Sequence, residues 1–157
     1  MSNCIKSNSE PVPSYAVRLV QINSRTLGVP NEQVASIAEW SQPSPLPFAP
    51  ESVLGIVCID GRMMTVIDLG ALLDPTALRQ PDNRRHIVAL RGDEQLALAV
   101  DAIKDTIELT KKDFAESREV CFLCGSVTYD GLDVHLVDIS QLFAAVIQGR
   151  ERRQRQA

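Results

Sequence analysis

Aromatic side chains make up only 4% of the 157 residues, and the chain holds a single tryptophan and two histidines. A hydrophobic core must therefore be built from aliphatic side chains, and the apolar content of 45% is sufficient for one. The sequence also lacks a serine–histidine–aspartate arrangement, a phosphate-binding glycine loop and a cluster of metal ligands. These absences argue against an enzyme and against a bound cofactor.

The charge balance excludes another class of protein. Lysine and arginine number 16 against 20 acidic residues, which gives a net charge of −4 and an isoelectric point of about 5.2. A general nucleic-acid binder normally carries a basic surface, so no nucleic-acid partner is expected. No apolar run reaches the roughly 18 residues of a membrane span, and no signal peptide is evident. We therefore expect a cytoplasmic protein without direct membrane insertion.

The four cysteines do not suggest a disulfide framework in such a compartment. Cys58 lies within an apolar run and is expected to be a small buried hydrophobic residue. Cys121 and Cys124 form one C-x-x-C motif, whereas a structural zinc site needs a second pair or nearby histidines. A thioredoxin-like pair should open a helix, but this pair leads into a predicted strand. Redox or metal chemistry at these two cysteines is therefore the alternative function, and packing is the favoured explanation.

A stretch of 19 residues occurs twice, 70 positions apart and without a gap. The first copy spans residues 55–73 and the second spans residues 125–143, and six of the 19 positions are identical. A period of this length is too long for a solenoid unit. The sequence therefore predicts two related halves, each containing the same strand–turn–strand–helix unit.

Each copy carries Asp-Gly between two apolar runs, at residues 60–61 and 130–131. This pair is typical of a two-residue type I′ hairpin turn, which needs positive φ at both central positions. The strand after each turn ends at Asp68 or Asp138, and a helix-compatible apolar run follows. Both aspartates are predicted to be helix N-caps, because a carboxylate that accepts backbone N–H bonds explains them without catalytic chemistry.

The rest of the chain also favours short strands. Further strands are predicted over residues 15–22, 27–30, 34–40, 84–90, 95–100 and 101–109. Four prolines within residues 41–50 predict a rigid surface connector, since proline fixes φ and restricts the preceding residue. Residues 1–13 are expected to form a flexible leader, residues 75–85 the joint between the halves, and residues 151–157 a basic tail. This pattern predicts a mainly β protein built from two small barrels that share a seam.

Residues 46–69 resemble the signature of the CheW-like coupling domain, a family of chemotaxis adaptors. The family reads roughly L-P-x-A-P-x-x-V-x-G-[VI]-[VI]-N-L-R-G-x-x-[VI]-P-[VI]-[VI]-D-L, and this chain reads L-P-F-A-P-E-S-V-L-G-I-V-C-I-D-G-R-M-M-T-V-I-D-L. Residues 96–103 look like the family's G-L-x-V-D-x-V segment, and residues 125–143 look like its final hairpin and helix. The resemblance covers residues 14–147 in the family's order.

The resemblance implies a single domain over residues 14–150, with two five-stranded SH3-like or OB-like barrels around a shared apolar seam. Short helices are implied after the hairpins and at the C-terminus. One barrel is expected to span about residues 23–81, and the other about residues 14–22 plus 82–150. The implied function is a non-enzymatic adaptor in a chemotaxis-like or twitching-motility pathway. Its implied partners are the cytoplasmic tip of a chemoreceptor and the regulatory domain of a CheA-type histidine kinase.

The resemblance also suggests where partners bind, near the first-copy hairpin and the seam. The expected contact residues are Val53, Ile56, Asp60, Arg62, Val100 and Asp101. In this chain Asp60 stands where the family has an arginine, which reverses the local charge, and Thr65 stands where the family has a proline. We therefore expect a variant adaptor.

A barrel that binds oligonucleotides is a third hypothesis. It would need exposed aromatic side chains on which bases can stack. The available aromatic residues are Tyr15, Trp40, Phe48, Phe114, Phe122, Tyr129 and Phe143. Several of them fall at positions that favour a structural role, so this hypothesis is the weakest.

Overall fold

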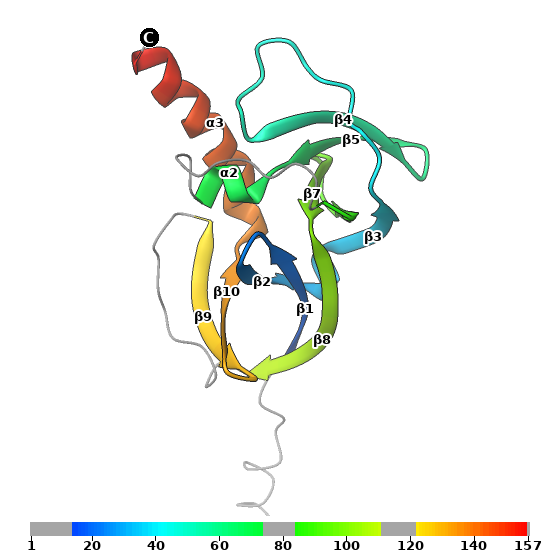
Figure 1. Cartoon of the computed structure of the whole chain (residues 1–157), viewed down its shortest axis with the longest axis vertical. Coiled ribbons are helices and arrows are strands. Elements are labelled where there is room, and N and C mark those ends of the chain that lie inside the picture. The colour runs from blue at the N-terminus through cyan, green and yellow to red at the C-terminus, as the bar shows by residue number, and fades with distance from the viewer. Residues whose placement is uncertain (1–13, 74–83, 111–121, 157) are drawn as a thin grey trace, which may run out of the picture.

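The computed structural model describes residues 14–73, 84–110 and 122–156 (Figure 1). The predicted leader, most of the predicted joint and Cys121 lie outside these residues. In chain order the elements are β1 (Ser14–Ile22), β2 (Arg25–Pro30), the 3-10 helix η1 (Asn31–Gln33), β3 (Val34–Glu39), β4 (Val53–Ile59), β5 (Arg62–Ile67), α2 (Leu69–Leu73), β6 (His86–Leu90), β7 (Leu96–Val100), β8 (Ala102–Thr110), β9 (Leu123–Tyr129), β10 (Leu132–Val137) and α3 (Ile139–Gln156). The predicted strands are confirmed, including the one from residue 34 whose composition was ambiguous.

The ten strands of the described residues form two five-stranded sheets, and each sheet curls toward a barrel (Figure 1). Barrel A has the strand order β8-β1-β2-β10-β9, and barrel B has the order β3-β6-β7-β5-β4. In both barrels the neighbours pair antiparallel except for one parallel contact, β2 with β10 in barrel A and β7 with β5 in barrel B. The predicted mainly β fold with two small barrels is confirmed.

The two halves of the chain exchange their first hairpins. Residues 14–73 and residues 84–156, apart from the undescribed residues 111–121, each supply a hairpin, a single strand, a second hairpin and a helix, in that order. The first hairpin of each half pairs with the single strand and second hairpin of the other half. The duplication therefore extends well beyond the 19 residues visible in the sequence.

This exchange corrects the expected barrel boundaries. The β2 strand, placed by the sequence in the barrel of residues 23–81, belongs to barrel A because it pairs with β1 and β10. The β6–β7 hairpin, assigned to the other barrel, belongs to barrel B because it pairs with β3 and β5. The physical reason is that the parallel contacts join strands from opposite halves of the chain.

The predicted turns and caps are confirmed. Asp60 and Gly61 have φ values of 51° and 79°, and Asp130 and Gly131 have 53° and 77°. Positive φ at both central positions is the geometry of the type I′ turn. The Asp68 carboxylate accepts the N–H of Gly70 at 3.0 Å, and the Asp138 carboxylate accepts the N–H of Ser140 at 3.1 Å. Both aspartates therefore cap helices that follow a hairpin.

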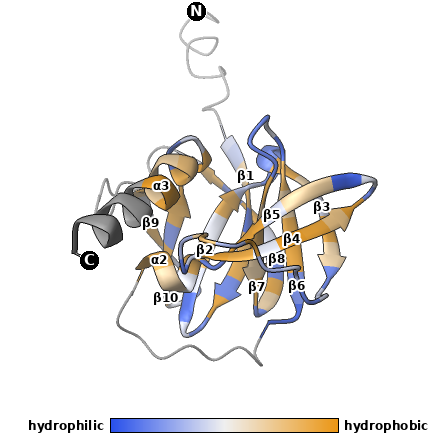
Figure 2. Ribbon diagram, turned by 90° about the horizontal axis from the view of Figure 1, so that it is seen from above, coloured by the Kyte–Doolittle hydropathy of each residue, from blue (hydrophilic) through white to orange (hydrophobic). Residues whose placement is uncertain are grey.

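In the part of the chain that the structure describes, the buried apolar residues gather in three cores. The seam between the barrels is the largest and takes residues from both sheets and from the helices. Each barrel also has a smaller interior core. Figure 2 shows that the strands of both sheets are largely hydrophobic, with hydrophilic segments at their turns. The predicted shared seam is thus confirmed.

The central strand β7 shows how two-sided burial shapes the sequence. All five of its residues are buried. Ala97 and Ala99 face the interior of barrel B, whereas Leu98 and Val100 face the seam. Small side chains suit the narrow barrel, and larger ones fill the seam. A strand buried on both faces reads as a continuous apolar run, which is why no alternation is visible here.

Gly28 on β2 has the corresponding position in barrel A. A Cβ atom added there would lie 2.6 Å from Cγ1 of Val17 and 2.8 Å from Cδ2 of Leu136. Both neighbours belong to the interior core of barrel A. The absent side chain therefore allows the hairpin of the first half to approach β10 of the second.

We predict that Gly28→Ala lowers the free energy of unfolding by about 1–3 kcal/mol, because the added methyl group overpacks the barrel interior. Urea denaturation monitored by circular dichroism measures this loss. The second substitution Val17→Ala makes room for that methyl group, so the double variant should lose less than the sum of the single variants. Strictly additive losses would show that the contact with Val17 is not the cause.

Candidate functional site

The first-copy hairpin, β4–β5, has one face inside barrel B and one face outside. The inward residues are Val57, Ile59, Met64 and Val66, all buried. The outward residues are Ile56, Cys58, Met63 and Thr65. Antiparallel pairing sets Ile56 opposite Thr65 and Cys58 opposite Met63, and the Met63 side chain is 58% exposed. The outer face therefore presents a short apolar surface to solvent.

The second-copy hairpin, β9–β10, provides an internal comparison, because it has the same turn and the same place in its barrel. Its outward residues at the equivalent positions are Ser126, Thr128, Asp133 and His135. The hydroxyl of Thr128 donates a hydrogen bond to the Asp133 carboxylate at 3.3 Å. One backbone unit thus carries a polar outer face in the second copy and an apolar one in the first. Folding alone does not require the apolar surface.

The expectation that Cys58 is buried is wrong. The residue is exposed, and its cross-strand partner is the exposed Met63. The reason is the alternation of the strand, which directs the neighbouring Val57 and Ile59 into the barrel and leaves Cys58 outside. An apolar run in sequence does not reveal which face of a strand is buried.

The structure divides the six expected contact residues into two groups. Asp60 and Arg62 are exposed at the tip of the first-copy hairpin, and the half-buried Ile56 lies further along its outer face. Val53 is at the opposite end of β4 and packs against the seam. Since a strand rises about 3.3 Å per residue, its seven residues separate the tip from the seam by roughly 20 Å.

The other two expected residues lie at the seam itself. Val100 is fully buried in the seam core, with an exposed fraction of 0%, so it supports the fold from inside. Asp101 follows it and is partly exposed. The six residues that the sequence predicts as one contact site therefore belong to two separate features, an exposed hairpin and a polar junction between the barrels.

The proline-rich connector packs along the edge of β4. The N–H of Ser44 bonds to the carbonyl of Ile56 at 2.9 Å, and the N–H of Ile56 bonds back at 2.8 Å. A Cβ atom on the neighbouring Gly55 would clash with the Ser44 carbonyl oxygen, and φ of Gly55 is 142°. Phe48 in this connector is 93% exposed with φ of 61°. The sequence singled out neither Phe48 nor Met63 as a contact, although Met63 differs in polarity from Asp133 in the second copy.

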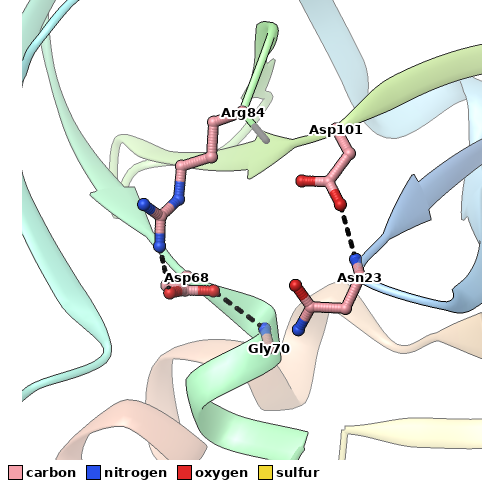
Figure 3. Close-up of polar contacts among 5 residues, drawn as sticks. All are labelled: Asn23, Asp68, Gly70, Arg84 and Asp101. Atoms are coloured by element: carbon pink, nitrogen blue, oxygen red, sulfur yellow. Dashed lines mark hydrogen bonds and ion pairs between the residues drawn. The ribbon is translucent and has the colours of Figure 1, made fainter. Parts of the chain in front are cut away.

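The polar junction is built around Asp68, the cap of α2 (Figure 3). One carboxylate oxygen accepts the Gly70 N–H, and the other forms an ion pair with Arg84 at 2.5 Å. The two charged side chains are only 11% and 10% exposed. The Arg84 guanidinium also lies over the ring of Trp40, 5.8 Å from its centroid. A charge pair with so little exposure depends on both partners, since removing one leaves the other poorly solvated.

Asp101 forms the second part of the junction (Figure 3). Its carboxylate accepts the N–H of Asn23, in the turn between β1 and β2, at 2.6 Å. Its own N–H donates to the carbonyl of Gln21 at 2.8 Å. Burial raises the pKa of Asp101 above the ordinary value of 3.8, the Asn23 bond and Arg84 oppose that rise, and the charge of Asp68 adds to it. The Asp101 carboxylate therefore stabilises a turn of barrel A, although partial burial of its negative charge is itself unfavourable.

The cysteine alternative gains no structural support. Cys124 is half-buried, with its Sγ 3.8 Å from the carbonyl oxygen of Leu136. Its predicted partner Cys121 lies outside the described residues. Within the described part of the chain, no three histidine, cysteine or acidic side chains are placed to hold a metal ion together. No helix in that part is long and apolar enough to cross a bilayer.

Two fused barrels with an exposed apolar hairpin define a domain suited to docking other proteins. The CheW-like domain family model matches residues 17–146, and the chain belongs to this family. The family consists of non-enzymatic scaffold proteins of bacterial chemotaxis, so the chain is an adaptor-type domain and not an enzyme.

Individual relatives agree with this assignment. The chain is 26% identical over 116 residues to the chemotaxis protein CheW of Rhizobium meliloti (strain 1021), covering 70% of this chain and 75% of that protein. It is 28% identical over 124 residues to the probable chemotaxis protein CheW of Rhizobium etli, covering 71% and 76%. The fold matches the crystal structure of the scaffolding protein TtCheW from Thermoanaerobacter tengcongensis with a TM-score of 0.72 at 19% identity, covering 83% and 93%.

We predict that Asp101→Asn is at least as stable as the original protein at neutral pH. The amide oxygen still accepts the Asn23 N–H, and the burial of a charge is avoided. Because the folded pKa of Asp101 is raised, the original protein loses stability as the pH rises from about 3.8 through the folded pKa, and it regains that stability on acidification. The difference between the two proteins should therefore shrink toward acidic pH.

Urea unfolding of both proteins between about pH 3 and pH 8 measures this effect. The exposed residue Asp105 provides the control substitution Asp105→Asn. An Asp101→Asn variant that is less stable at neutral pH, by an amount that does not change on acidification, would contradict the assigned cost of the charge.

Proposed function

We propose that this protein couples a sensory receptor to a CheA-type histidine kinase, as an adaptor in a chemotaxis-like or twitching-motility pathway. Membership of the CheW-like family supports the class of partner. The observation that carries the proposal is the apolar outer face of the first-copy hairpin, which is polar in the second copy. The protein acts in the cytoplasm and reaches membrane-associated receptor arrays through its partners.

The receptor tip binds the outer face of the first-copy hairpin. Ile56 and Met63 supply apolar contact there, and Asp60 and Arg62 supply opposite charges at the tip. Apolar area in the centre of an interface supplies most of its binding energy, whereas charges at its rim set orientation and association rate. Val53 and Val100 hold the base of this surface from the seam side, and Asp101 belongs to the junction behind it.

The kinase regulatory domain binds a separate part of the molecule, so that both partners are held at once. Each contact can then be weak, because a scaffold that holds several partners raises the effective concentration at every site. A protein with this role needs two docking surfaces in a fixed relation and no reactive group. The two fused barrels provide such a frame.

The direct test is binding to the regulatory domain of the cognate kinase and to a soluble fragment of the cognate receptor tip. Gel filtration and pull-down at about 100 μM detect complexes in the weak range expected of scaffold contacts. A complex that contains receptor fragment, adaptor and kinase domain together would support the proposal. Absence of association with both partners at this concentration would refute it.

We predict that Met63→Asp weakens binding of the receptor fragment by about 10-fold, equivalent to about 1.4 kcal/mol, because a charge replaces exposed apolar contact area. The matched control is Leu132→Asp on the second-copy hairpin, where the original side chain is 47% exposed. Isothermal titration calorimetry measures the affinity of both variants for the receptor fragment and shows which hairpin contacts it. Equal losses in both variants would place the receptor site elsewhere.

We also predict that Asp60→Arg strengthens binding to a receptor tip of the usual family type, because it restores the sign of charge found in the family motif. The gain should fall as salt is raised, since exposed charges are screened over about 10 Å at 0.1 M ionic strength. Binding measured across a salt series gives both results. If the variant and the original protein have the same affinity at every salt concentration, Asp60 does not contribute to the receptor interface.

A further inference from the structure

The polar junction lies where the exchanged hairpin of barrel A meets barrel B. Asn23 belongs to the turn between β1 and β2, which are strands of barrel A. Asp68 and Asp101 follow β5 and β7, which are strands of barrel B, and Arg84 precedes β6 of the same barrel. The Asp68–Arg84 ion pair therefore lies within barrel B, whereas the bonds of Asp101 to Asn23 and Gln21 run between the two barrels (Figure 3).

The turn is held on two sides. The Asp101 carboxylate accepts the Asn23 N–H, and the Asp101 N–H donates to the Gln21 carbonyl. Two hydrogen bonds therefore connect the end of β7 to the turn. On the other side the Asn23 side chain lies against Gly70 of α2, where an added Cβ atom would be 2.6 Å from Nδ2. Asn23 has a positive φ of 56°, so the turn keeps a conformation that few residues adopt freely.

The Arg84 guanidinium is bonded to one of the two carboxylates at this junction and acts on the other only through its charge. Arg84 forms an ion pair with Asp68, and its charge also favours the ionised form of Asp101, lowering the pKa of that residue. Asp68 acts in the opposite sense and raises the same pKa through like-charge repulsion. The turn contributes the neutral N–H of Asn23. Without Arg84, the buried Asp68 carboxylate would lose its ion-pair partner, and both negative charges would remain at the junction beside the turn.

The position of Arg84 is itself fixed by neighbouring contacts. The next residue, Arg85, donates its N–H to the carbonyl of Val100 at 3.0 Å and accepts the N–H of Trp40 at 2.9 Å. The Trp40 ring then covers the Arg84 guanidinium. A planar guanidinium held between an aromatic ring and a carboxylate loses little additional entropy when it forms its hydrogen bonds. The cation is therefore preorganised beside Asp68.

We propose that Arg84 is a positioning residue that fixes the angle between the two barrels, by neutralising Asp68 and Asp101 so that the Asn23 turn can rest against α2. The proposal concerns the shape of the free protein and does not depend on which partners it binds. It assigns to the partly buried Arg84 a role that the family resemblance did not indicate. In its absence the repulsion between the carboxylates is relieved by movement of the turn, and the barrels sample a range of angles.

The distance between the barrels tests this proposal directly. Spin labels are attached at Cys58 on barrel B and at position 128 on barrel A through the substitution Thr128→Cys, since both sites are exposed. The reporter background replaces the other cysteines through Cys4→Ser, Cys121→Ser and Cys124→Ala. Pulsed electron–electron double resonance then gives the distribution of distances between the labels.

In this background Arg84→Gln should broaden the distribution by about twofold or more, because a single orientation is replaced by an ensemble. The adjacent exposed arginine provides the control Arg85→Gln, which should leave the distribution unchanged. An Arg84→Gln protein that folds with an unchanged distribution would overturn the proposal.

The double variant Arg84→Gln/Asp101→Asn distinguishes charge repulsion from a general loss of packing. It removes the second carboxylate charge but keeps an acceptor for the Asn23 N–H, so the narrow distribution should return. Thermal unfolding by circular dichroism shows whether each variant is folded. If the single variant does not fold, the double variant decides the question: a folded protein with the original distribution supports the proposal, and an unfolded or broadened one refutes it.

Discussion

The two parallel contacts, β2 with β10 and β7 with β5, are the interaction on which the rest of this structure depends. Each joins the first hairpin of one half of the chain to the last strand of the other half. Without them neither sheet has five strands, and the seam loses one of its two walls. Since each contact requires both halves, neither five-stranded sheet can be completed by one half of the chain alone.

Duplication also separates the requirements of folding from those of binding. The inward residues of the two second hairpins, such as Val57 and Val127, keep their apolar character because each fills a barrel. The outward residues have diverged, from Cys58 and Met63 in one copy to Thr128 and Asp133 in the other. The comparison within one chain identifies an apolar surface that the fold does not need. Such a surface is expected of an adaptor, because an adaptor acts by binding other proteins and not by catalysis.

The local features of the fold could be predicted from sequence, because the residues that determine them are neighbours. The Asp-Gly turns and the aspartate caps each depend on a few consecutive residues, and all four were predicted. The barrel boundaries were predicted wrongly, because the choice of a partner strand depends on contacts between distant segments. The burial of Cys58 was also predicted wrongly, since an apolar run leaves the two faces of a strand undistinguished.

The candidate site shows the same limit of local reasoning. Asp60 and Arg62 were placed correctly at an exposed tip, because turns are exposed and their residues are adjacent in sequence. Asp101 was selected as a contact, but its main partner is Asn23, 78 positions away, and no local pattern connects the two. Arg84 was not selected, because an arginine in a polar stretch before a strand is indistinguishable from a solvated one. Its low exposure becomes visible only when Asp68 and Trp40 are brought beside it.

The exchange of hairpins has a consequence for synthesis on the ribosome. The β1–β2 hairpin is made early, but β10, its parallel neighbour, is the last strand of the described chain. At translation rates of about 5–20 residues per second, the roughly 100 intervening residues delay that partner by on the order of 5–20 s. Val17 and Leu27 belong to different cores, and both cores include residues of β10. Throughout this interval neither core is complete. The nascent chain therefore exposes apolar strand faces for far longer than a hairpin takes to form, and chaperones have ample time to bind it before the last strand arrives.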